Sequence, residues 1–302
     1  MPAARVSIVI PHLNQPEFLR RCLNSLAPQV QVLGGVEVIV VDNGSKVLPT
    51  DVCSEFDWAI LITEPTPGPG PARNRGISKS SAPLLAFIDA DCIANENWLA
   101  AILAEFDGNP ETLIVGGDVR IGREIPSAPT ALEAYESVFA YRQKEYIEKL
   151  GFSGTGNLAM RRAAFDRVGP FAGIAVAEDR DWGRRATGMG LKIKYLANMI
   201  VYHPARKTIA ELRKKWDRHI SHDYEEKSAG FAGKLKWAGL TVAVAASGIL
   251  DARKVMTSNR VTTLRERALA SHVLLQIRLY RAGRMASQLV NPDYSSKKWN
   301  RS

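Results

Sequence analysis

The chain has 302 residues, of which 46% are hydrophobic and 24% charged, so its composition is that of a folded globular protein and not of a disordered one. Its three cysteines are odd in number and have no short metal-ligand spacing, which argues against a disulfide framework and favours a reducing compartment, the cytoplasm. The first residues run straight into a strand-like segment without the pattern of an export signal, which agrees with that expectation.

The formal net charge of +9 is unevenly distributed along the chain. Residues 1–205 hold 20 Lys and Arg against 23 Asp and Glu, whereas residues 206–302 hold 20 against 8, so the first part is −3 and the second +12. Such asymmetry predicts contact with something anionic, which could be phospholipid headgroups, nucleic acid or an acidic polymer. A well-solvated helical surface is the alternative that charge alone leaves open.

Short apolar, β-branched runs alternate with helical patterns from the first residues to about Pro204. This alternation predicts an α/β fold in which a Rossmann-like, mixed but mostly parallel sheet is flanked by helices. Ligands of such folds gather at the carboxyl ends of the strands, so we expect the site among residues 12–14, 42–45 and 89–91. The expected strands are Val6–Ile10, Val36–Val41, Ala59–Thr63, Leu84–Asp89, Leu113–Gly117 and Ile193–Tyr202, and the expected helices of the first half are Glu17–Leu26, Ala72–Ser80 and Trp98–Phe106.

Beyond Pro204 the pattern changes to long helices rich in Lys and Arg. This region contains an apolar segment, Trp237–Leu250, which at 14 residues is shorter than the roughly 20 needed to cross a bilayer. We expect a buried helix there, ahead of one that lies in a membrane interface. The expected domains are 1–205, with a nucleotide-binding half at about 1–118 and an acceptor half at about 119–205, and a basic C-terminal helical region at 206–302.

Two carboxylates, Asp89 and Asp91, end the apolar run that begins at Leu84. Extended residues i and i+2 face the same side, so these side chains can together hold a hard cation such as Mg²⁺ or Mn²⁺ and a ribose hydroxyl. An ordinary turn is the alternative, because Asp is a common turn residue. The position directly after a buried strand favours the ligand site.

A second acidic group, Glu178-Asp179-Arg180-Asp181, precedes a helical pattern. Acidic residues are favoured in a first helical turn, so capping is the structural explanation for at least one of them. A carboxylate here could instead take a proton from a sugar hydroxyl, which needs an acceptor within hydrogen-bond reach. We choose Asp179 for that role.

Two further polar positions follow apolar strands. Asp42 and Asn43 come after Val38–Val41, at a turn of small residues that could approach a ligand closely or merely end the strand. His203 follows the last expected strand, where it is either a satisfied structural histidine or a neutral imidazole that completes a metal shell.

Taken together and in this order, these segments resemble the family 2 inverting glycosyltransferases, which have a GT-A fold. The resemblance covers about two thirds of the chain, and although no one motif is decisive, several in register are specific. The segments that carry it are Val6–Leu26, Val36–Ser45, Gly70–Gly76 with its Ala-Arg-Asn-x-Gly pattern, Asp89–Asp91, Gly154–Arg161 with Phe165–Phe171, and Glu178–Asp179.

The resemblance implies a metal-dependent enzyme that moves a sugar from a nucleotide-diphosphate donor to an acceptor hydroxyl and inverts the anomeric configuration. Asp91 would be the main ligand of Mn²⁺ or Mg²⁺, with His203 as the second candidate. Asp179 would be the catalytic base. The nucleotide-sugar contacts are expected at Pro11, Asn14, Asp42, Asn43, Arg73 and Asp89.

Departures from the family pattern refine the expected substrates. UDP is the expected nucleotide of the family pattern, but Asn43 stands where a second Asp often contacts uracil, so dTDP and GDP are left open as alternatives. The segment Leu212–Trp216 lacks the Gln of the Gln-x-x-Arg-Trp of processive members, so we expect transfer of a single sugar in surface polysaccharide synthesis. The charge of 206–302 fits peripheral docking on the anionic inner face of a plasma membrane, where a lipid-linked acceptor would be presented; a free glycan is the other acceptor considered.

Three rival functions remain weaker. A dinucleotide-dependent oxidoreductase would need glycine at Arg73 to complete Gly-x-Gly-x-x-Gly. A non-catalytic nucleotide- or sugar-binding protein would have no use for both Asp91 and Asp179. Nucleic-acid binding would interleave aromatic residues with the basic ones, whereas the aromatic residues after 205 are scattered, so no nucleic-acid partner is expected.

Overall fold

The computed structural model describes residues 4–228 and 230–291. The chain divides into two compact units. The sheet unit comprises Met1–Arg120 and Arg142–Pro204, and the helical unit comprises Ile121–Tyr141 and Ala205–Ser302. The predicted domains placed all of 119–205 with the sheet, whereas the contacts group Ile121–Tyr141 with the helices that follow Pro204.

The sheet unit is built on an eight-stranded sheet of order β3-β2-β1-β4-β7-β6-β8-β5. The first four strands in that order run parallel, and β7 pairs antiparallel with both β4 and β6. The strands are β1 (Val6–His12), β2 (Val36–Asp42), β3 (Ala59–Thr63), β4 (Leu84–Ile88), β5 (Ile93–Ala94), β6 (Ile114–Gly122), β7 (Asn157–Arg161) and β8 (Ile193–Pro204).

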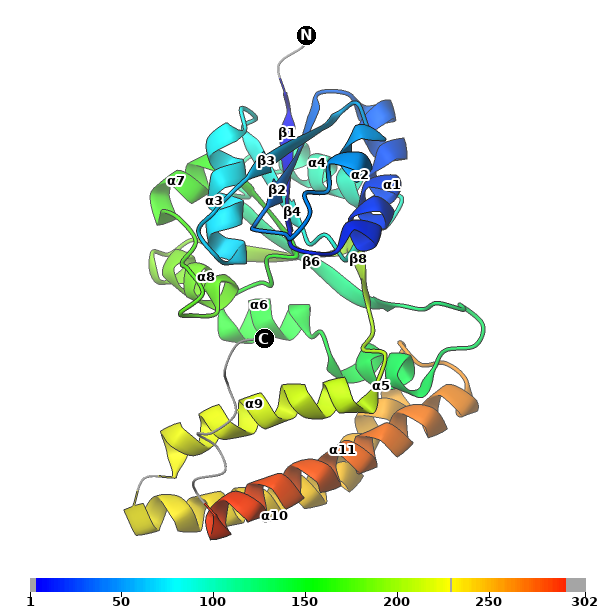
Figure 1. The fold of residues 1–302 in the computed structure, drawn as a ribbon, viewed down its shortest axis with the longest axis vertical. Coiled ribbons are helices and arrows are strands. Elements are labelled where there is room, and N and C mark those ends of the chain that lie inside the picture. The colour runs from blue at the N-terminus through cyan, green and yellow to red at the C-terminus, as the bar shows by residue number, and fades with distance from the viewer. Residues whose placement is uncertain (1–3, 229, 292–302) are drawn as a thin grey trace. The chain divides into compact units, whose positions relative to one another are not determined.

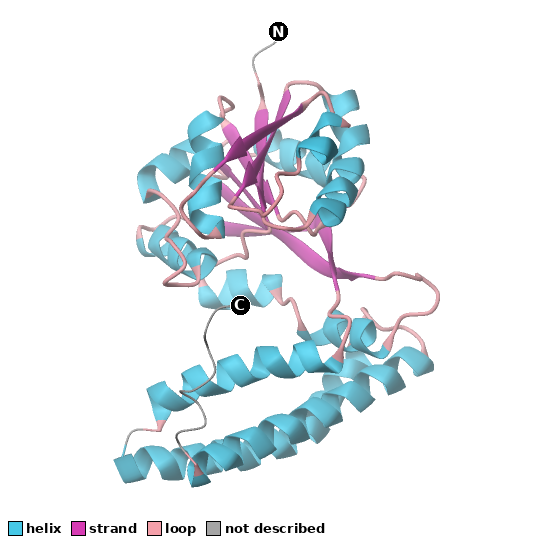
Figure 2. Cartoon of the chain, in the orientation of Figure 1, coloured by secondary structure: helices cyan, strands magenta, loops and turns pink. Residues whose placement is uncertain are grey.

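Helices cover both faces of this sheet, as Figures 1 and 2 show. Gly76 allows its helix to pack closely against one face of the sheet, because a Cβ atom at this position would lie 2.3 Å from Cγ1 of Val9 on β1. The core beneath includes Phe87, Phe171 and Trp182, all buried. The helices are α1 (Pro16–Leu33), α2 (Thr50–Ser54), α3 (Pro69–Lys79), α4 (Trp98–Gly108), α6 (Gln143–Leu150), α7 (Arg162–Val168) and α8 (Glu178–Gly188).

The predicted fold class is confirmed, and each strand expected from the sequence is present with ends shifted by a few residues. Two strands were not expected. β7 lies in Gly154–Arg161, a segment that the sequence analysis used for the family resemblance but did not assign to a strand. β5 has only two residues, which are too few to show a periodic pattern. Their antiparallel pairing makes the sheet mixed.

Asn157 at the start of β7 joins three elements of the sheet unit. Its fully buried side chain donates to the carbonyl oxygens of Asp118 and Met199, both at 2.9 Å, and accepts from the indole of Trp98 at 2.8 Å. Replacing it with alanine leaves these buried groups without partners, at about 1–3 kcal/mol each when nothing compensates. We expect Asn157→Ala to lower the free energy of unfolding by about 3 kcal/mol, measured by urea denaturation. A loss below about 1 kcal/mol would show that the network is not needed.

Within its described residues, the helical unit forms four helices: α5 (Ala131–Phe139), α9 (Ile209–Lys227), α10 (Gly230–Thr257) and α11 (Leu264–Val290). Threonine side chains cap the N-termini of α5, α9 and α11, each accepting from a backbone N–H three residues on. The apolar core of this unit contains Tyr135, Leu212, Val255 and Ile277. The three long helices pack on one another, and α5 packs against α11.

The expectation of a short buried helix at Trp237–Leu250 is wrong. The helix α10 has 28 residues, long and apolar enough by length and composition to cross a membrane, and only 17% of its most apolar window is buried. Phe231, Leu235, Val242 and Ile249 are each at least 66% exposed. Their spacing of four, seven and seven residues places them on one helical face. An apolar stripe therefore faces outward along most of α10.

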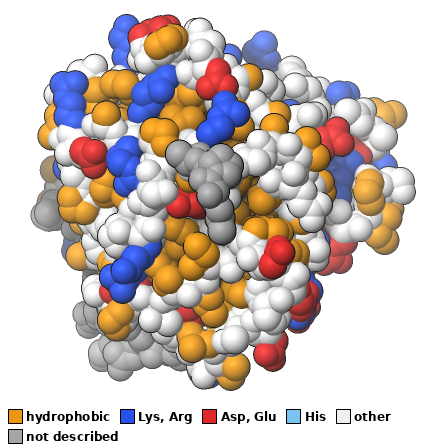
Figure 3. All heavy atoms as spheres, turned by 90° about the horizontal axis from the view of Figure 1, so that it is seen from above, with side chains coloured by type: hydrophobic (Ala, Val, Ile, Leu, Met, Phe, Trp, Pro, Cys, Tyr) orange, Lys and Arg blue, Asp and Glu red, His pale blue; other side chains and the backbone are white. Residues whose placement is uncertain are grey.

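One face of the molecule, drawn in Figure 3, carries charged side chains of both signs. On the face of the molecule in Figure 3, Lys and Arg side chains are interspersed with Asp and Glu and with apolar groups. Mixed charge of this kind is typical of a solvated surface.

Candidate active site

Polar side chains gather where the parallel strands β1, β2 and β4 end. His12 is the last residue of β1, Asp42 is the last of β2, and Asp89 directly follows β4. Because the carboxyl ends of parallel strands meet at one edge of a sheet, this edge collects the groups that the sequence analysis singled out.

Arg73 on α3 links two acidic segments that are far apart in sequence. Its guanidinium donates to Oδ1 of Asp89 at 2.6 Å and to Oε1 of Glu178 at 2.9 Å. The side chain is only 2% exposed, and its Nε is buried without a partner among the described residues. The structure thus brings the Asp-x-Asp segment and the start of α8 together through one buried guanidinium group.

Asp91 and His203, the two predicted metal ligands, lie side by side. Oδ2 of Asp91 is 3.4 Å from Nε2 of His203, while Nδ1 of His203 is 2.7 Å from the carbonyl oxygen of Pro204. A proton on Nδ1, donated to that carbonyl, leaves the Nε2 lone pair directed toward Asp91. The pair offers one oxygen ligand from the turn between β4 and β5 and one nitrogen ligand from β8.

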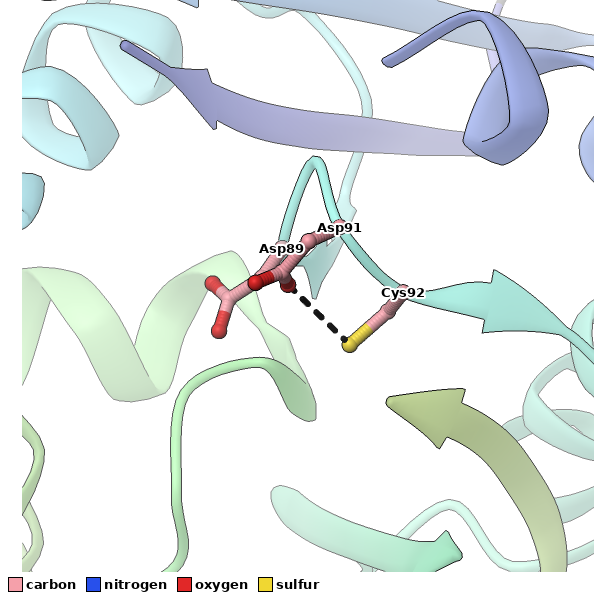
Figure 4. Close-up of side chains that lie close together, drawn as sticks. All are labelled: Asp89, Asp91 and Cys92. Atoms are coloured by element: carbon pink, nitrogen blue, oxygen red, sulfur yellow. Dashed lines mark hydrogen bonds between the residues drawn. The ribbon is translucent and has the colours of Figure 1, made fainter. Parts of the chain in front are cut away.

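Three potential ligand atoms, from Asp89, Asp91 and Cys92, lie within 4.8 Å of one another. Figure 4 shows them on the turn after β4, with the Cys92 thiol directed at the Asp91 carboxylate. Burial raises the pKa of Cys92 well above the usual value, and the two aspartates raise it further. A thiol that stays protonated is a poor ligand for a hard cation, so the carboxylates and His203 form the better donor set for Mn²⁺ or Mg²⁺.

Burial also raises the pKa of Asp91, and nearby Asp89 adds to the effect while His203 opposes it. Two partly buried carboxylates beside each other repel, and a divalent cation between them would remove that repulsion. The residues present therefore fit a divalent metal.

Asp179 lies in the first turn of α8, directly after Glu178. Its Oδ1 accepts a 2.7 Å hydrogen bond from the backbone N–H of Arg180. Burial raises the pKa of Asp179 above that of an ordinary aspartate, although the hydrogen bond from Arg180 works against this. A carboxylate with a raised pKa is a stronger base, which suits proton removal from a hydroxyl.

Asp42 is held ionised by donors around it. It accepts from Nδ1 of His12 at 2.9 Å and from the backbone N–H groups of Gly44 and Ser45. Burial alone would raise the pKa of Asp42, but the hydrogen bonds from Ser45 and His12 outweigh it, and the net pKa lies below the usual value. The turn after β2 is fixed by these bonds.

Asn43, Asn14 and Pro11 build the loops beside this turn. The amide of Asn43 donates to the carbonyl oxygens of Glu64 and Thr66 and accepts from the backbone of Gly68, so its polar atoms are used within the sheet unit. Asn14 has a positive φ of 53° and accepts from the backbone of Lys46. Pro11 lies in β1 beside Val41. The nucleotide contacts expected at these three residues stay predictions.

Gly156, just before β7, is required by the position of Asp89. A Cβ atom at Gly156 would lie 2.3 Å from Oδ2 of Asp89, so any side chain must displace that carboxylate. The displaced atom is the end of a side chain, so the fold has room to adjust. We expect Gly156→Ala to weaken nucleotide-sugar binding at least tenfold, measured by calorimetry, with a melting temperature within a few degrees of the parent protein. Unchanged affinity would show that the position of Asp89 does not matter for the donor.

Three of these residues were not assigned roles from the sequence: His12, Gly156 and Glu178. His12 is hydrogen-bonded to Asp42, 30 residues away in the chain, and Glu178 to Arg73, 105 residues away. Glu178 belongs to the Glu-Asp pair, but the sequence contains no sign that Arg73 is its partner. Gly156 belongs to the motif segment Gly154–Arg161, but the sequence does not show that its missing side chain makes room for the Asp89 carboxylate.

The candidate site therefore combines three features near the carboxyl ends of the strands. These are side chains that could hold a divalent metal, the buried guanidinium of Arg73, and the Asp179 carboxylate with its raised pKa. Such a set can bind a charged diphosphate through a metal and remove a proton from an attacking hydroxyl.

Solved structures with the same fold include the mannosyltransferase PcManGT from Pyrobaculum calidifontis in complex with GDP-Man and Mn²⁺, which is 16% identical, with a TM-score of 0.56 over 96% of this chain and 88% of that one. Another is S. aureus TarS 1–349 in complex with UDP-GlcNAc, with 17% identity and a TM-score of 0.51 over 92% of each chain. A third is glucosyl-3-phosphoglycerate synthase from Mycobacterium tuberculosis with Mg²⁺ and UDP, with 22% identity and a TM-score of 0.51 over 69% of this chain and 74% of that one. At these identities the likeness shows the fold, which is GT-A-like.

Sequence relatives are closer. The glycosyltransferase AglE of Haloferax volcanii is 36% identical over 216 residues, which are 70% of this chain and 70% of that protein. The pre-mycofactocin glycosyltransferase of Mycobacterium tuberculosis is 28% identical over 210 residues, 67% of this chain, but the match spans only 43% of that protein. The model of the family described as glycosyl transferase family 2 matches residues 7–169. With its fold, its strand-edge site and this match over more than half its length, the chain belongs to glycosyl transferase family 2 and is a glycosyltransferase that uses a nucleotide-sugar donor.

Proposed function

We propose that the protein transfers a single sugar from a nucleotide-diphosphate sugar to a hydroxyl of a glycan or lipid-linked acceptor in surface polysaccharide synthesis, in a metal-dependent reaction that inverts the anomeric carbon. The observation that carries this proposal is the placement of Asp91 with His203, and of Asp89 with Arg73 and Glu178, at one strand edge. Asp179 stands next to Glu178 at the start of α8.

In the proposed reaction each side chain has one role. Asp91 and His203 hold the divalent cation, which when bound offsets the negative charge that grows on the departing diphosphate. Asp89 accepts a hydrogen bond from a ribose hydroxyl, which can reach the carboxylate because this side chain is 37% exposed. Arg73 positions Asp89 and adds positive charge near the diphosphate.

Asp179 removes the proton from the acceptor hydroxyl as its oxygen attacks the anomeric carbon opposite the leaving group. The C–O bond to the acceptor forms, the C–O bond to the diphosphate breaks, and the configuration inverts. Base catalysis of this kind contributes about 10²–10⁴-fold to the rate.

The donor nucleotide is proposed to be UDP, with GDP and dTDP as the alternatives. Among the structural neighbours, PcManGT binds GDP-Man and TarS binds UDP-GlcNAc, so the fold accommodates both bases in those proteins. In this chain Asn43 is engaged with loop carbonyl groups and the Asp42 side chain is buried, which leaves the backbone of the turn after β2 to contact the expected base.

Calorimetric titration of the protein with UDP, GDP and dTDP, each with and without Mn²⁺, tests this proposal. We expect one nucleotide to bind, and to bind at least tenfold more tightly with the metal present. Binding that is equal with and without Mn²⁺ would contradict the metal role, and binding of none of the three would contradict the donor assignment.

Peripheral membrane attachment, from the cytoplasmic side, is proposed for the helical unit. The net charge of +12 on residues 206–302 and the outward apolar stripe of α10 together support it, because basic charge attracts anionic headgroups and apolar side chains enter the interface. This attachment would present a lipid-linked acceptor to the enzyme.

Sedimentation with vesicles of phosphatidylcholine and phosphatidylglycerol measures this attachment. We expect Val242→Asp, which places a charge in the stripe, to reduce the bound fraction at least fivefold. Val32→Asp on α1 is the matched control, because Val32 is also exposed on a helix, at 83%. An equal effect of the two substitutions would contradict a membrane role for the stripe.

A further inference from the structure

A group of basic side chains in the helical unit is concentrated around Trp216 on α9. The guanidinium carbon of Arg281, on α11, lies 3.6 Å from the centre of the Trp216 ring, and Nζ of Lys215 lies 5.8 Å from it. His219 packs against the same ring, with 5.7 Å between ring centres. We call this group the α9–α11 cationic cluster; it consists of Arg206, Lys215, Arg218, His219, Arg278 and Arg281.

The carboxylates nearest this cluster are already paired, two of them with Arg206 and Arg278, which are members of the cluster. Glu136 on α5 is paired with Arg206, both through its side chain and through the Arg206 backbone N–H. Asp251 is paired with Arg278 and with Lys254.

On α9 itself the two described aspartates are also engaged. Asp217 accepts from Tyr280 and pairs with Arg284, and Asp223 pairs with Lys227 at 2.6 Å.

In the described ranges, by contrast, Lys215 and Arg281 form no ion pair. Nε of Arg281 and Nε of Arg278 are both buried without a hydrogen-bond partner among these residues. Buried donors of a charged group are costly to leave unpaired. The α9–α11 cationic cluster therefore holds more positive charge and more donors than its own carboxylates satisfy.

The titration behaviour of the cluster reflects the same imbalance. Burial lowers the pKa of Lys215 to about 8, and the neighbouring Arg206 adds to the effect although Glu136 opposes it. Burial lowers the pKa of Arg281 to about 10, with a further contribution from Arg278. A bound anion would oppose these shifts.

We propose that the α9–α11 cationic cluster binds a phosphate or diphosphate group, as carried by the lipid-linked acceptor. Guanidinium groups with free donors match the geometry of phosphate oxygens, and the stack of Arg281 on Trp216 holds one of them in a fixed orientation. The assignment of this anion to the acceptor rests on the proposed function, whereas the anion site itself does not.

The source of the phosphate is argued from the same unit. The apolar stripe of α10 belongs to the helical unit that carries the cluster, so a ligand with a charged head and an apolar chain matches both features of this unit. A free phosphate would use only the cluster.

Calorimetry with inorganic pyrophosphate, in a buffer with EDTA so that no divalent metal is present, tests the site directly. We expect binding to the parent protein and at least tenfold weaker binding to Lys215→Met and to Arg281→Gln. Lys214→Ala is the matched control, because Lys214 is the neighbouring, exposed lysine of the same helix and we expect its affinity to be unchanged. Equal loss in all three variants, or no binding to the parent protein, would overturn the proposal.

Thermal unfolding distinguishes a ligand site from a purely structural cluster. Because Lys215 is repelled by its neighbours, Lys215→Met should unfold at the same or a higher temperature than the parent protein without pyrophosphate. The parent protein should gain stability on addition of pyrophosphate, and the variant should not. If the variant unfolds at a lower temperature and still responds to pyrophosphate, Lys215 has a structural role and the proposal fails.

Vesicles distinguish a lipid source from a free anion. We expect tighter binding to phosphatidylcholine vesicles that contain a polyprenyl phosphate than to vesicles with an equal charge of phosphatidylglycerol, with the difference lost in Arg281→Gln. Equal binding to both, with pyrophosphate binding intact, would overturn the lipid source. Donor binding with Mn²⁺, measured on the same variants, reports separately on the proposed function, since all these substitutions lie in the helical unit.

Discussion

Asp179→Asn is expected to lower the turnover of sugar transfer by about 10³-fold while leaving donor affinity within twofold, because the amide cannot accept the hydroxyl proton. The substitution preserves the size of the side chain, and its oxygen can still accept the 2.7 Å hydrogen bond from the backbone of Arg180. Transfer is measured as release of nucleotide diphosphate with acceptor present, and donor affinity by calorimetry with Mn²⁺.

The matched control is Asp181→Asn, two residues further along α8. Asp181 pairs with Arg185 at 2.9 Å and also lies in the first turn, so its loss reports on helix stability without touching the proposed base. We expect near-normal turnover from it. Equal loss in both variants, or near-normal turnover in Asp179→Asn, would remove the base assignment.

The pH dependence of the parent enzyme is a second measurement of the same residue. Burial raises the pKa of Asp179, so this carboxyl stays protonated up to a higher pH than an ordinary aspartate. Only the ionised form accepts a proton, so turnover should fall as the pH drops through that raised pKa. We expect the acidic limb of the profile above the ordinary aspartate range, and its disappearance from the residual activity of Asp179→Asn.

The part of this site that lies at the carboxyl ends of the strands could be predicted from the sequence, because the signals for it are local. Asp42 and Asp89 come at the ends of buried apolar runs, and the carboxyl ends of neighbouring parallel strands lie at the same edge of a sheet. The same reasoning cannot place Arg73 between Asp89 and Glu178, since that contact depends on how α3 and α8 pack over separations of 16 and 105 residues.

The error on α10 has a different cause. Composition identified the apolar core of the segment, but the helix extends beyond it at both ends, and apolar periodicity does not tell whether a stripe meets protein or solvent. The antiparallel strand β7 was missed because Asn157–Arg161 mixes polar and apolar residues without strict alternation.

Asp91→Ala is expected to remove the metal dependence of nucleotide binding and to lower turnover by about 10²–10³-fold, the loss of roughly 3–4 kcal/mol of charge stabilisation at the diphosphate. Calorimetry with the nucleotide that binds the parent protein, with and without Mn²⁺, measures the first effect. His203→Gln should reduce metal affinity by a smaller factor, because one ligand remains in Asp91 and the second is replaced by a weaker donor.

Two further measurements separate a lost metal ligand from a damaged fold. Burial and Asp89 raise the pKa of Asp91, so its ionised form is destabilising without metal, and Asp91→Ala should unfold at the same or a higher temperature in EDTA. In Mn²⁺ the parent protein should gain stability that the variant does not. Cys92→Ala should keep the Mn²⁺ response, because a thiol with a strongly raised pKa contributes no thiolate to the metal. A Mn²⁺ response lost in Cys92→Ala but kept in Asp91→Ala would place the metal on the sulfur, and the carboxylate scheme for the whole site would be wrong.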